Sequence, residues 1–297
     1  MKKKIAFLFF ILLVLLLGFF LVTYQKNDYL FFSGADQNPN GITFVLFGRT
    51  GKVIGWNMSP DLTDTIMVVD YRPNIGVVNL ISLPRDLYVN LDGENFKLNE
   101  VVERGKVDDF LNNLLPELTG LQTNNYAIVD IGLLQKIVDN LGGIDVDLKS
   151  PLTDWASGYT IQAGNQHLDG TQVVWLVRNR YAPNGDFFRE KNQHQIIQTI
   201  AQKIEGLNAL EKTAFLFKLT PDLATSINTN MNPQIFITLM EKFHSVRFND
   251  VVMDFGSGLL ESATTTAGSS TEDILLPVKG SDNYDNIRNY IESKLEK

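Results

Sequence analysis

Residues 65–82 read TIMVVDYRPNIGVVNLIS, two apolar and largely β-branched runs separated by residues that favour turns. The runs 65–70 and 76–82 predict two strands, and the segment between them predicts the turn of a hairpin. If the strands pair antiparallel, the start of the first and the end of the second lie at one edge of the sheet. Pro84 ends the second strand at that edge. We therefore expect Asp64 and Arg85 to be neighbours.

Patterns typical of strands and helices alternate along the rest of the chain, which predicts an α/β layered domain. The further strands that we expect cover residues 42–47, 126–129, 144–147, 251–255 and 274–276. The helices that we expect cover residues 107–118, 133–141, 186–205, 207–219, 232–244 and 283–297. Residues 171–177 fit either a buried helical turn or a strand. The Ser-, Thr- and Gly-rich residues 256–273 predict a mobile loop.

The segment 178–193 gathers three arginines, Arg178, Arg180 and Arg189, in a chain that is acidic overall. Surface solvation explains such a group poorly, and arginine forks bind the oxygens of anions bidentately. On the helix that starts near residue 186, Asp186, Arg189 and Gln193 follow at i, i+3 and i+7 and share one face. This segment predicts an anion site, although Arg189 is also compatible with pairing to Asp186 or Glu190 on the helix surface. Arg178 and Arg180 would point to different sides of a helix and converge only if the helix ends there, as Pro183 indicates.

The N-terminus has the pattern of a membrane anchor. Residues 1–4 contain three lysines, and residues 5–22 are an apolar run without charge, long enough to cross most of a bilayer. A cleaved signal peptide is the competing interpretation, but no small-residue cleavage pattern follows the run. We expect a cytoplasmic tail over 1–4, an anchor over 5–24, a polar linker over 25–40 and an extracytoplasmic domain over 41–297.

Composition excludes several classes of function. The net charge of −8 argues against binding to nucleic acid, whose phosphates require a basic surface. The absence of cysteine excludes disulfides, thiolate metal sites and cysteine catalysis. The three histidines lack the spacing of a zinc site, and we expect none of them to be catalytic. His194 is the one candidate for an exception, because it adjoins Gln193.

Seven short segments of this chain form an ordered set: 63–67 (TDTIM), 82–86 (SLPRD), 97–99 (KLN), 138–144 (VDNLGGI), 168–170 (LDG), 178–180 (RNR) and 186–193 (DFFREKNQ). Each segment alone is weakly specific, but the ordered set is specific. In this order the segments resemble the LytR-CpsA-Psr family of bacterial cell-envelope enzymes, and the resemblance covers a core of about 42–207 that leaves 208–297 as a C-terminal extension.

The resemblance implies a three-layer α-β-α sandwich with a central mixed sheet and an apolar channel for a polyprenyl tail. It implies transfer of a glycopolymer from a polyprenyl pyrophosphate carrier to a hydroxyl of peptidoglycan or another wall acceptor, at the membrane and usually with Mg²⁺. It also implies roles for individual residues: Asp64 as a carboxylate near the metal, Asp186 as the acid that orients the arginines, and as pyrophosphate ligands Arg85, Arg178, Arg180, Arg189 and Gln193. Among these, the resemblance makes Asp64, Arg85, Asp186 and Arg189 the catalytic set.

Two departures from the family pattern concern the metal. Family members usually carry a second aspartate shortly after the first strand, where this chain has Arg49 and Thr50, and often an arginine where it has Leu62. The loss of an acid and the gain of Arg49 predict a weaker metal site, in which Arg49 could replace part of the metal's charge. Two alternatives therefore stay open: a non-catalytic protein that binds lipid-linked glycan, and a hydrolase of polyprenyl pyrophosphate.

Overall fold

The structure is a computed structural model that describes residues 41–50, 61–154, 157–180, 185–231, 246–267 and 270–296. Among these residues, no helix combines the length and the apolar character that crossing a bilayer requires. The anchor predicted over 5–24, the linker over 25–40 and the helix predicted over 232–244 lie outside the described residues.

A six-stranded sheet forms the centre of the domain, with strand order β11-β6-β1-β2-β3-β12. Its strands are β1 (Ile42–Arg49), β2 (Thr63–Arg72), β3 (Val77–Ser82), β6 (Tyr126–Asp130), β11 (Ile227–Thr229) and β12 (Arg247–Val251). The sheet is mixed, because β1 pairs antiparallel with β2 and parallel with β6, while β3 pairs antiparallel with β2 and parallel with β12. The predicted hairpin over residues 65–82 is thus confirmed as β2 and β3.

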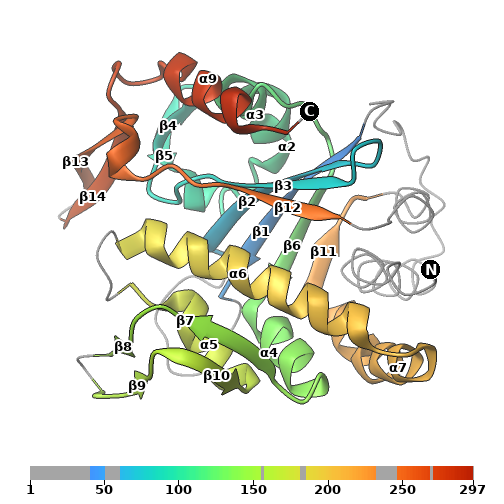
Figure 1. The fold of residues 1–297 in the computed structure, drawn as a ribbon. Helices are drawn as coiled ribbons and strands as arrows, with labels where there is room; N and C mark the ends of the chain where they lie inside the picture. The colour runs from blue at the N-terminus through green and yellow to red at the C-terminus, as the bar shows by residue number, and fades with distance from the viewer. Residues whose placement is uncertain are drawn as a thin grey trace.

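Helices cover both faces of this sheet and give the three layers seen in Figure 1. One layer contains α4 (Ile131–Asn140), α5 (Gly170–Arg178), α6 (Gly185–Gly206) and α7 (Ala209–Ser226). The other contains α2 (Val107–Asp109), a π-helical turn (Phe110–Leu114), α3 (Leu115–Thr119) and α9 (Asp285–Lys294). The layered fold with a central mixed sheet agrees with the sequence prediction.

The alternation of side chains along the strands produces the two cores. Phe44 and Met67 point into the cluster under α4 to α7, whereas their neighbours Val45 and Ile66 point into the cluster under α2, α3 and α9. Successive residues of a strand face opposite sides of a sheet, so apolar runs such as 42–47 and 65–69 supply both cores at once. A sheet buried on both faces is the physical reason that these segments contain so few polar residues.

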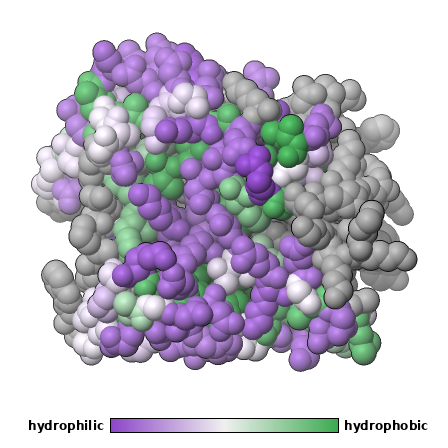
Figure 2. Space-filling model, viewed as in Figure 1, coloured by the Kyte–Doolittle hydropathy of each residue, from purple (hydrophilic) through white to green (hydrophobic). Residues whose placement is uncertain are grey.

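Smaller hairpins and turns surround the central sheet. They comprise β4 (Tyr88–Leu91) with β5 (Glu94–Lys97), β7 (Ile144–Leu148) with β10 (Gly164–Leu168), β8 (Leu152–Thr153) with β9 (Thr160–Ile161), β13 (Leu260–Ala267) with β14 (Ser270–Pro277), and the 3-10 turns Leu98–Glu100 and Phe255–Ser257. The face shown in Figure 2 is largely hydrophilic, with hydrophobic residues in separate patches between the layers.

Three segments differ from the sequence expectation or resolve it. Residues 171–177, which fitted a helix or a strand, belong to helix α5, and Asp169 caps it by accepting a hydrogen bond from the backbone N–H of Gln172. The late strand expected over 251–255 lies earlier, as β12. The central residues of 256–273, expected to be a loop, form β13 instead, whose Thr264, Thr265 and Thr266 pair with β14.

Candidate active site

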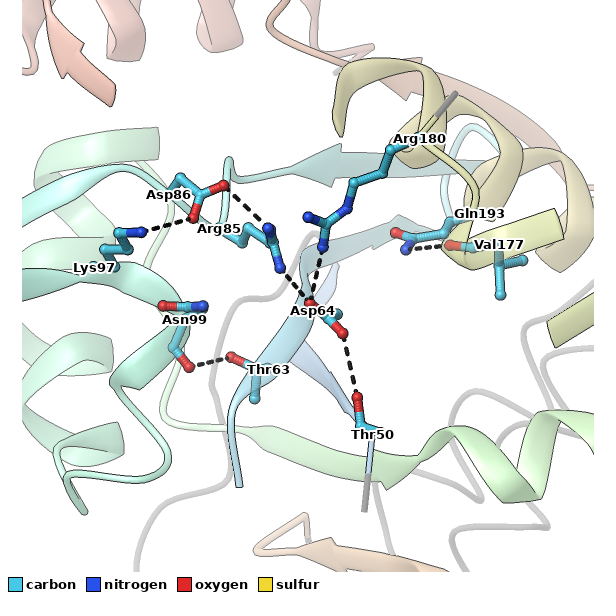
Figure 3. A network of polar contacts seen from close by, with 10 residues as sticks. All are labelled: Thr50, Thr63, Asp64, Arg85, Asp86, Lys97, Asn99, Val177, Arg180 and Gln193. Atoms are coloured by element: carbon cyan, nitrogen blue, oxygen red, sulfur yellow. Dashed lines mark hydrogen bonds and ion pairs between the residues drawn. The ribbon is translucent and has the colours of Figure 1, made fainter. Parts of the chain in front are cut away.

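Asp64 lies within a group of arginines at the end of the central sheet where β2 begins and β3 ends. It is the second residue of β2, and Arg85 follows the end of β3, so the antiparallel hairpin brings the two together. Nη1 of Arg85 donates to Oδ1 of Asp64 at 2.5 Å. Figure 3 shows Arg85 and Arg180 reaching the carboxylate from different elements. The neighbourhood of Asp64 and Arg85 predicted from the hairpin is confirmed.

Arg180 comes to the same carboxylate from the segment that follows α5. Helix α5 ends at Arg178, and Asn179 has an extended backbone with φ −68° and ψ 131°. This break turns the chain so that Nη2 of Arg180 lies 3.5 Å from Oδ1 of Asp64. Arg178 lines the cavity described below. The helix end expected after Arg178 therefore brings both arginines to the site.

Helix α6 supplies the remaining predicted residues. Arg189 is almost fully buried, with 2% of its surface exposed, and its charge acts on Asp64. Gln193 donates from Nε2 to the backbone carbonyl of Val177 at 3.3 Å, which joins α6 to the last turn of α5. Asp186 lies in the first turn of α6, but its side chain is outside the described part of the structure.

Electrostatics keep the carboxylate ionised. Burial alone would raise the pKa of Asp64, but the charges of Arg85, Arg189 and Arg180 and the hydrogen bond from Arg85 outweigh it, so the pKa lies below its ordinary value. Burial is the main cause of a lowered pKa for Arg178, partly offset by Asp64. The site is thus a cationic cluster around one carboxylate, a charge distribution suited to an anionic ligand.

Residues of the segments 82–86 and 97–99 that have no role predicted from the sequence support the position of Arg85. Nε of Arg85 lies 3.2 Å from Oδ2 of Asp86, and Nζ of Lys97 lies 3.6 Å from Oδ1 of Asp86. The hydroxyl of Thr63 donates to the carbonyl of Asn99 at 3.0 Å, which fixes the 3-10 turn beside the start of β2. Their place in the segments 82–86 and 97–99 was the signal that could have identified them.

Arg49 and Thr50, where the family pattern is broken, have separate partners. The hydroxyl of Thr50 donates to Oδ2 of Asp64 at 3.2 Å. Arg49 instead lies between two other carboxylates, with Nε 2.5 Å from Asp130 and Nη1 2.5 Å from Asp61. Burial opposes the charged form of Arg49, but these two acids raise its pKa overall. In the described contacts, Arg49 is held by Asp61 and Asp130 and not by Asp64.

These residues supply few oxygens for a magnesium ion. Oδ1 of Asp64 accepts from two arginines and Oδ2 accepts from Thr50, while Asp61 and Asp130 pair with Arg49. Within the described ranges, no group of three or more acidic, histidine or cysteine side chains is arranged so that it could hold a metal ion. Mg²⁺ prefers several oxygen ligands. The residues fit this ion only if phosphate oxygens and water complete its coordination around Oδ2 of Asp64.

An apolar cavity of about 180 Å³ opens beside the arginine cluster. It lies between the sheet and helices α4 and α6, and its lining includes Asp64, Arg178 and Gln193 of the charged site. Its apolar wall includes Leu46, Leu133, Leu134, Ile137, Ile196, Ile197, Ile200 and Ile227. An apolar space of this kind was expected from the resemblance, and it meets the charged site without an intervening element.

Fold and site together define a class of protein: a three-layer α/β domain in which an arginine cluster borders an apolar cavity. The profile of the LytR_cpsA_psr family matches residues 24–258. The chain belongs to this family.

Proteins of related sequence and structure agree with that assignment. The chain is 30% identical over 186 residues to the polyisoprenyl-teichoic acid–peptidoglycan teichoic acid transferase TagU of Enterococcus faecalis, a match covering 61% of this chain and 57% of that protein. It is 34% identical over 176 residues to the probable cell wall biosynthesis protein LcpB of Corynebacterium glutamicum, covering 59% and 41%. The matched region thus spans about half the length of these relatives.

Similarity also extends to solved structures. Protein gbs0355 from Streptococcus agalactiae superposes with a TM-score of 0.65 at 20% identity, covering 87% of this chain and 89% of that one. At this level of identity the similarity establishes the fold alone.

Proposed function

We propose that this protein transfers a glycopolymer from a polyprenyl pyrophosphate carrier to a hydroxyl of peptidoglycan or another wall acceptor. The observation that carries the proposal is the direct junction of the apolar cavity with the arginine cluster around Asp64. A ligand that suits both parts has an apolar tail and a compact, multiply charged head. A polyprenyl pyrophosphate has this composition, and the name of the Enterococcus faecalis relative refers to a polyisoprenyl-linked polymer.

In the proposed reaction, the oxygen of the acceptor hydroxyl forms a bond to the phosphorus that carries the glycan, and its proton passes to water or to the departing polyprenyl phosphate. The bond from that phosphorus to the bridging oxygen of the pyrophosphate breaks, and polyprenyl phosphate leaves. Negative charge develops on the bridging and non-bridging oxygens. Preorganised guanidinium groups stabilise such charge, and loss of one donor in comparable sites costs about 10²- to 10³-fold in rate.

The residues have distinct proposed tasks. Arg85, Arg178, Arg180 and Arg189 bind the phosphate oxygens, and Gln193 holds the end of α5 beside them. Asp64, kept ionised by its neighbours, orients Arg85 and Arg180. Its lowered pKa makes Asp64 a weak base, so we give it a positioning task. Asp186 stays a predicted orienting acid.

Magnesium, the membrane anchor and the extracytoplasmic location stay predictions from the sequence. Oδ2 of Asp64 is the oxygen that would hold Mg²⁺, with Thr50 beside it. When bound there, the ion would neutralise part of the phosphate charge. Residues 5–24 would keep the cavity close to the bilayer from which the carrier comes.

The decisive experiment uses the purified chain, a short-chain polyprenyl pyrophosphate glycan, and peptidoglycan fragments as the acceptor, with Mg²⁺ or with a chelator. We expect acceptor-dependent release of polyprenyl phosphate and a covalent glycan–acceptor product. Release that does not depend on the acceptor would favour the hydrolase. Binding without turnover in either metal condition would favour the non-catalytic binder and would refute the transferase.

A further inference from the structure

A buried histidine on α6 contacts two neighbouring strands outside the site described so far. Nε2 of His194 lies 2.9 Å from the hydroxyl of Ser82 on β3, and Nδ1 lies 3.1 Å from Oδ1 of Asp250 on β12. His194 and Ser82 are each 1% exposed. Burying a polar ring without partners is costly, so the hydrogen bond to Ser82, together with the charge of Asp250 at ion-pair distance from Nδ1, indicates a specific role for His194.

The two partners constrain the ring differently. A carboxylate only accepts hydrogen bonds, so a favourable contact with Asp250 requires a proton on Nδ1, whereas the hydroxyl of Ser82 can either donate to Nε2 or accept from it. Asp250 is itself held by Nε2 of Gln198, which donates to both carboxylate oxygens at 2.8 and 3.0 Å. Burial would raise the pKa of Asp250, but the contacts with His194 and Gln198 lower it overall. Asp250 therefore stays an anion beside the ring.

The Ser82, His194 and Asp250 arrangement has the order of a nucleophilic triad, but its location argues against that chemistry. The hydroxyl of Ser82 is buried, and neither Ser82 nor His194 lines the cavity. An attacking oxygen must reach its substrate, so a sequestered hydroxyl does not fit a nucleophile. The contacts are better explained by what they hold in place.

His194 follows Gln193 directly, and consecutive helical residues point about 100° apart. Gln193 donates to the carbonyl of Val177, directly before Arg178 in the last turn of α5. His194 contacts Ser82 at the end of β3, three residues before Arg85. Helix α6 is thus held on two sides, and each side is adjacent to an arginine-bearing segment.

We propose that His194 is a positioning residue: by joining Ser82 to Asp250 it fixes α6, and with it Arg189 and Gln193, relative to the loop that carries Arg85. The inference rests on the proposed function for its activity readout, but pyrophosphate binding tests it independently. Misplacement of about 1 Å at a remote support can cost on the order of 10²-fold in rate, so a partial loss of this contact should be measurable.

The test compares His194→Gln, Ser82→Ala and the double variant with His167→Gln. His167 is a matched control, because its Nδ1 lies 2.7 Å from Asp145 in an exposed pair on β10 and β7, away from the arginines. Three quantities are measured for each variant: kcat and KM with the short-chain lipid-linked glycan, the Kd for inorganic pyrophosphate by calorimetry, and the urea midpoint.

We expect His194→Gln and Ser82→Ala each to lower kcat and to weaken pyrophosphate binding by about tenfold. The double variant should be no worse than the poorer single variant, because each substitution removes the same contact between His194 and Ser82. His167→Gln should match the wild type in both. If His194→Gln fails to fold, Ser82→Ala, the smaller change, decides the outcome.

A lower urea midpoint with unchanged kcat and Kd in folded variants would reduce His194 to a stability role and overturn the inference. A wild type that binds pyrophosphate but transfers no glycan would refute the proposed function alone. A higher Kd for pyrophosphate in the variants would then still support the positioning role. A wild type that neither binds pyrophosphate nor turns over would overturn both.

Discussion

Nη1 of Arg85 lies 2.5 Å from Oδ1 of Asp64, and this contact joins the two free ends of the β2–β3 hairpin. The carboxylate holds Arg85 and Arg180 with their forks directed to one point. An incoming phosphate must compete with Asp64 for these donors, or bind their remaining N–H groups. Asp64 thus sets both the geometry of the arginines and the cost of recruiting them.

Removal of Arg85 should abolish most activity without unfolding the domain. We expect Arg85→Ala to lower kcat by about 10²- to 10³-fold, because a preorganised donor to the developing charge is lost. Arg104→Ala is the matched control, because Arg104 belongs to an ion pair outside the site, in which its Nη2 lies 2.7 Å from Oε2 of Glu100 four residues earlier. Turnover and circular dichroism of both variants provide the measurement, and a fully active Arg85→Ala would refute the proposed site.

The stability of the domain should depend on pH through Asp64. Its pKa in the folded state is below the ordinary 3.8, so its stabilising contribution is complete above about pH 4 and is lost as the pH falls through the folded-state pKa. We expect the difference in the free energy of unfolding between wild type and Asp64→Asn to be constant near neutral pH and to shrink below pH 4. Urea unfolding at pH 7, 5 and 3 measures it, and parallel pH curves would contradict the assigned shift.

A second carboxylate beside Asp64 should strengthen metal binding. Thr50→Asp places an acid where the hydroxyl now lies 3.2 Å from Oδ2 of Asp64, and two adjacent carboxylates favour a divalent cation. We expect Mg²⁺ to bind at least about tenfold more tightly than to the wild type. Calorimetric titration with Mg²⁺ alone measures this, with Thr50→Asn as the uncharged control. Equal affinities for the two variants would exclude Asp64 and position 50 as a metal pair.

Filling the cavity should discriminate between carriers of different length. Ile197 is a partly buried residue of the cavity wall, and Ile197→Trp would fill part of the space that we propose for the lipid tail. Loss of burial for two methylene groups costs about 1.6 kcal/mol, or more than tenfold in affinity. We expect the KM for a long-chain carrier to rise by at least this factor, while a short-chain pyrophosphate is hardly affected. Ile75→Trp, on the exposed turn of the β2–β3 hairpin, is the control, and equal losses for both chain lengths would place the tail elsewhere.

The sequence predicted contacts that local pattern and turn chemistry determine. Pro84 and the hairpin sufficed to bring Asp64 to Arg85, and the end of α5 brought Arg180 to them. The pairing of Arg49 with Asp130 could not be predicted, because Asp130 lies opposite Arg49 in the parallel pairing of β1 with β6, 81 residues along the chain. Parallel pairing leaves no turn signal in the sequence.

The composition of two segments led to predictions that the structure corrects, a strand over 251–255 and a loop over 256–273. Strand β12 contains the polar residues Arg247, Asn249 and Asp250, which an edge strand tolerates. The strand was therefore predicted over the more apolar residues 251–255 that follow. Strand β13 is rich in threonine, which is β-branched and favours strands, but its Ser- and Gly-rich surroundings are typical of loops. His194 was flagged only for its place beside Gln193, since nothing local connects it to Ser82 or Asp250.

The cavity wall shares residues with the main hydrophobic core, among them Leu133, Ile196 and Ile200. An empty apolar space inside a core lowers stability by an amount that grows with its volume. Under the proposed function, a bound lipid tail would therefore fill part of the folded interior, and the amount of intact protein would follow the supply of lipid carrier. The enzyme would then be most vulnerable to proteases when it has no substrate to process.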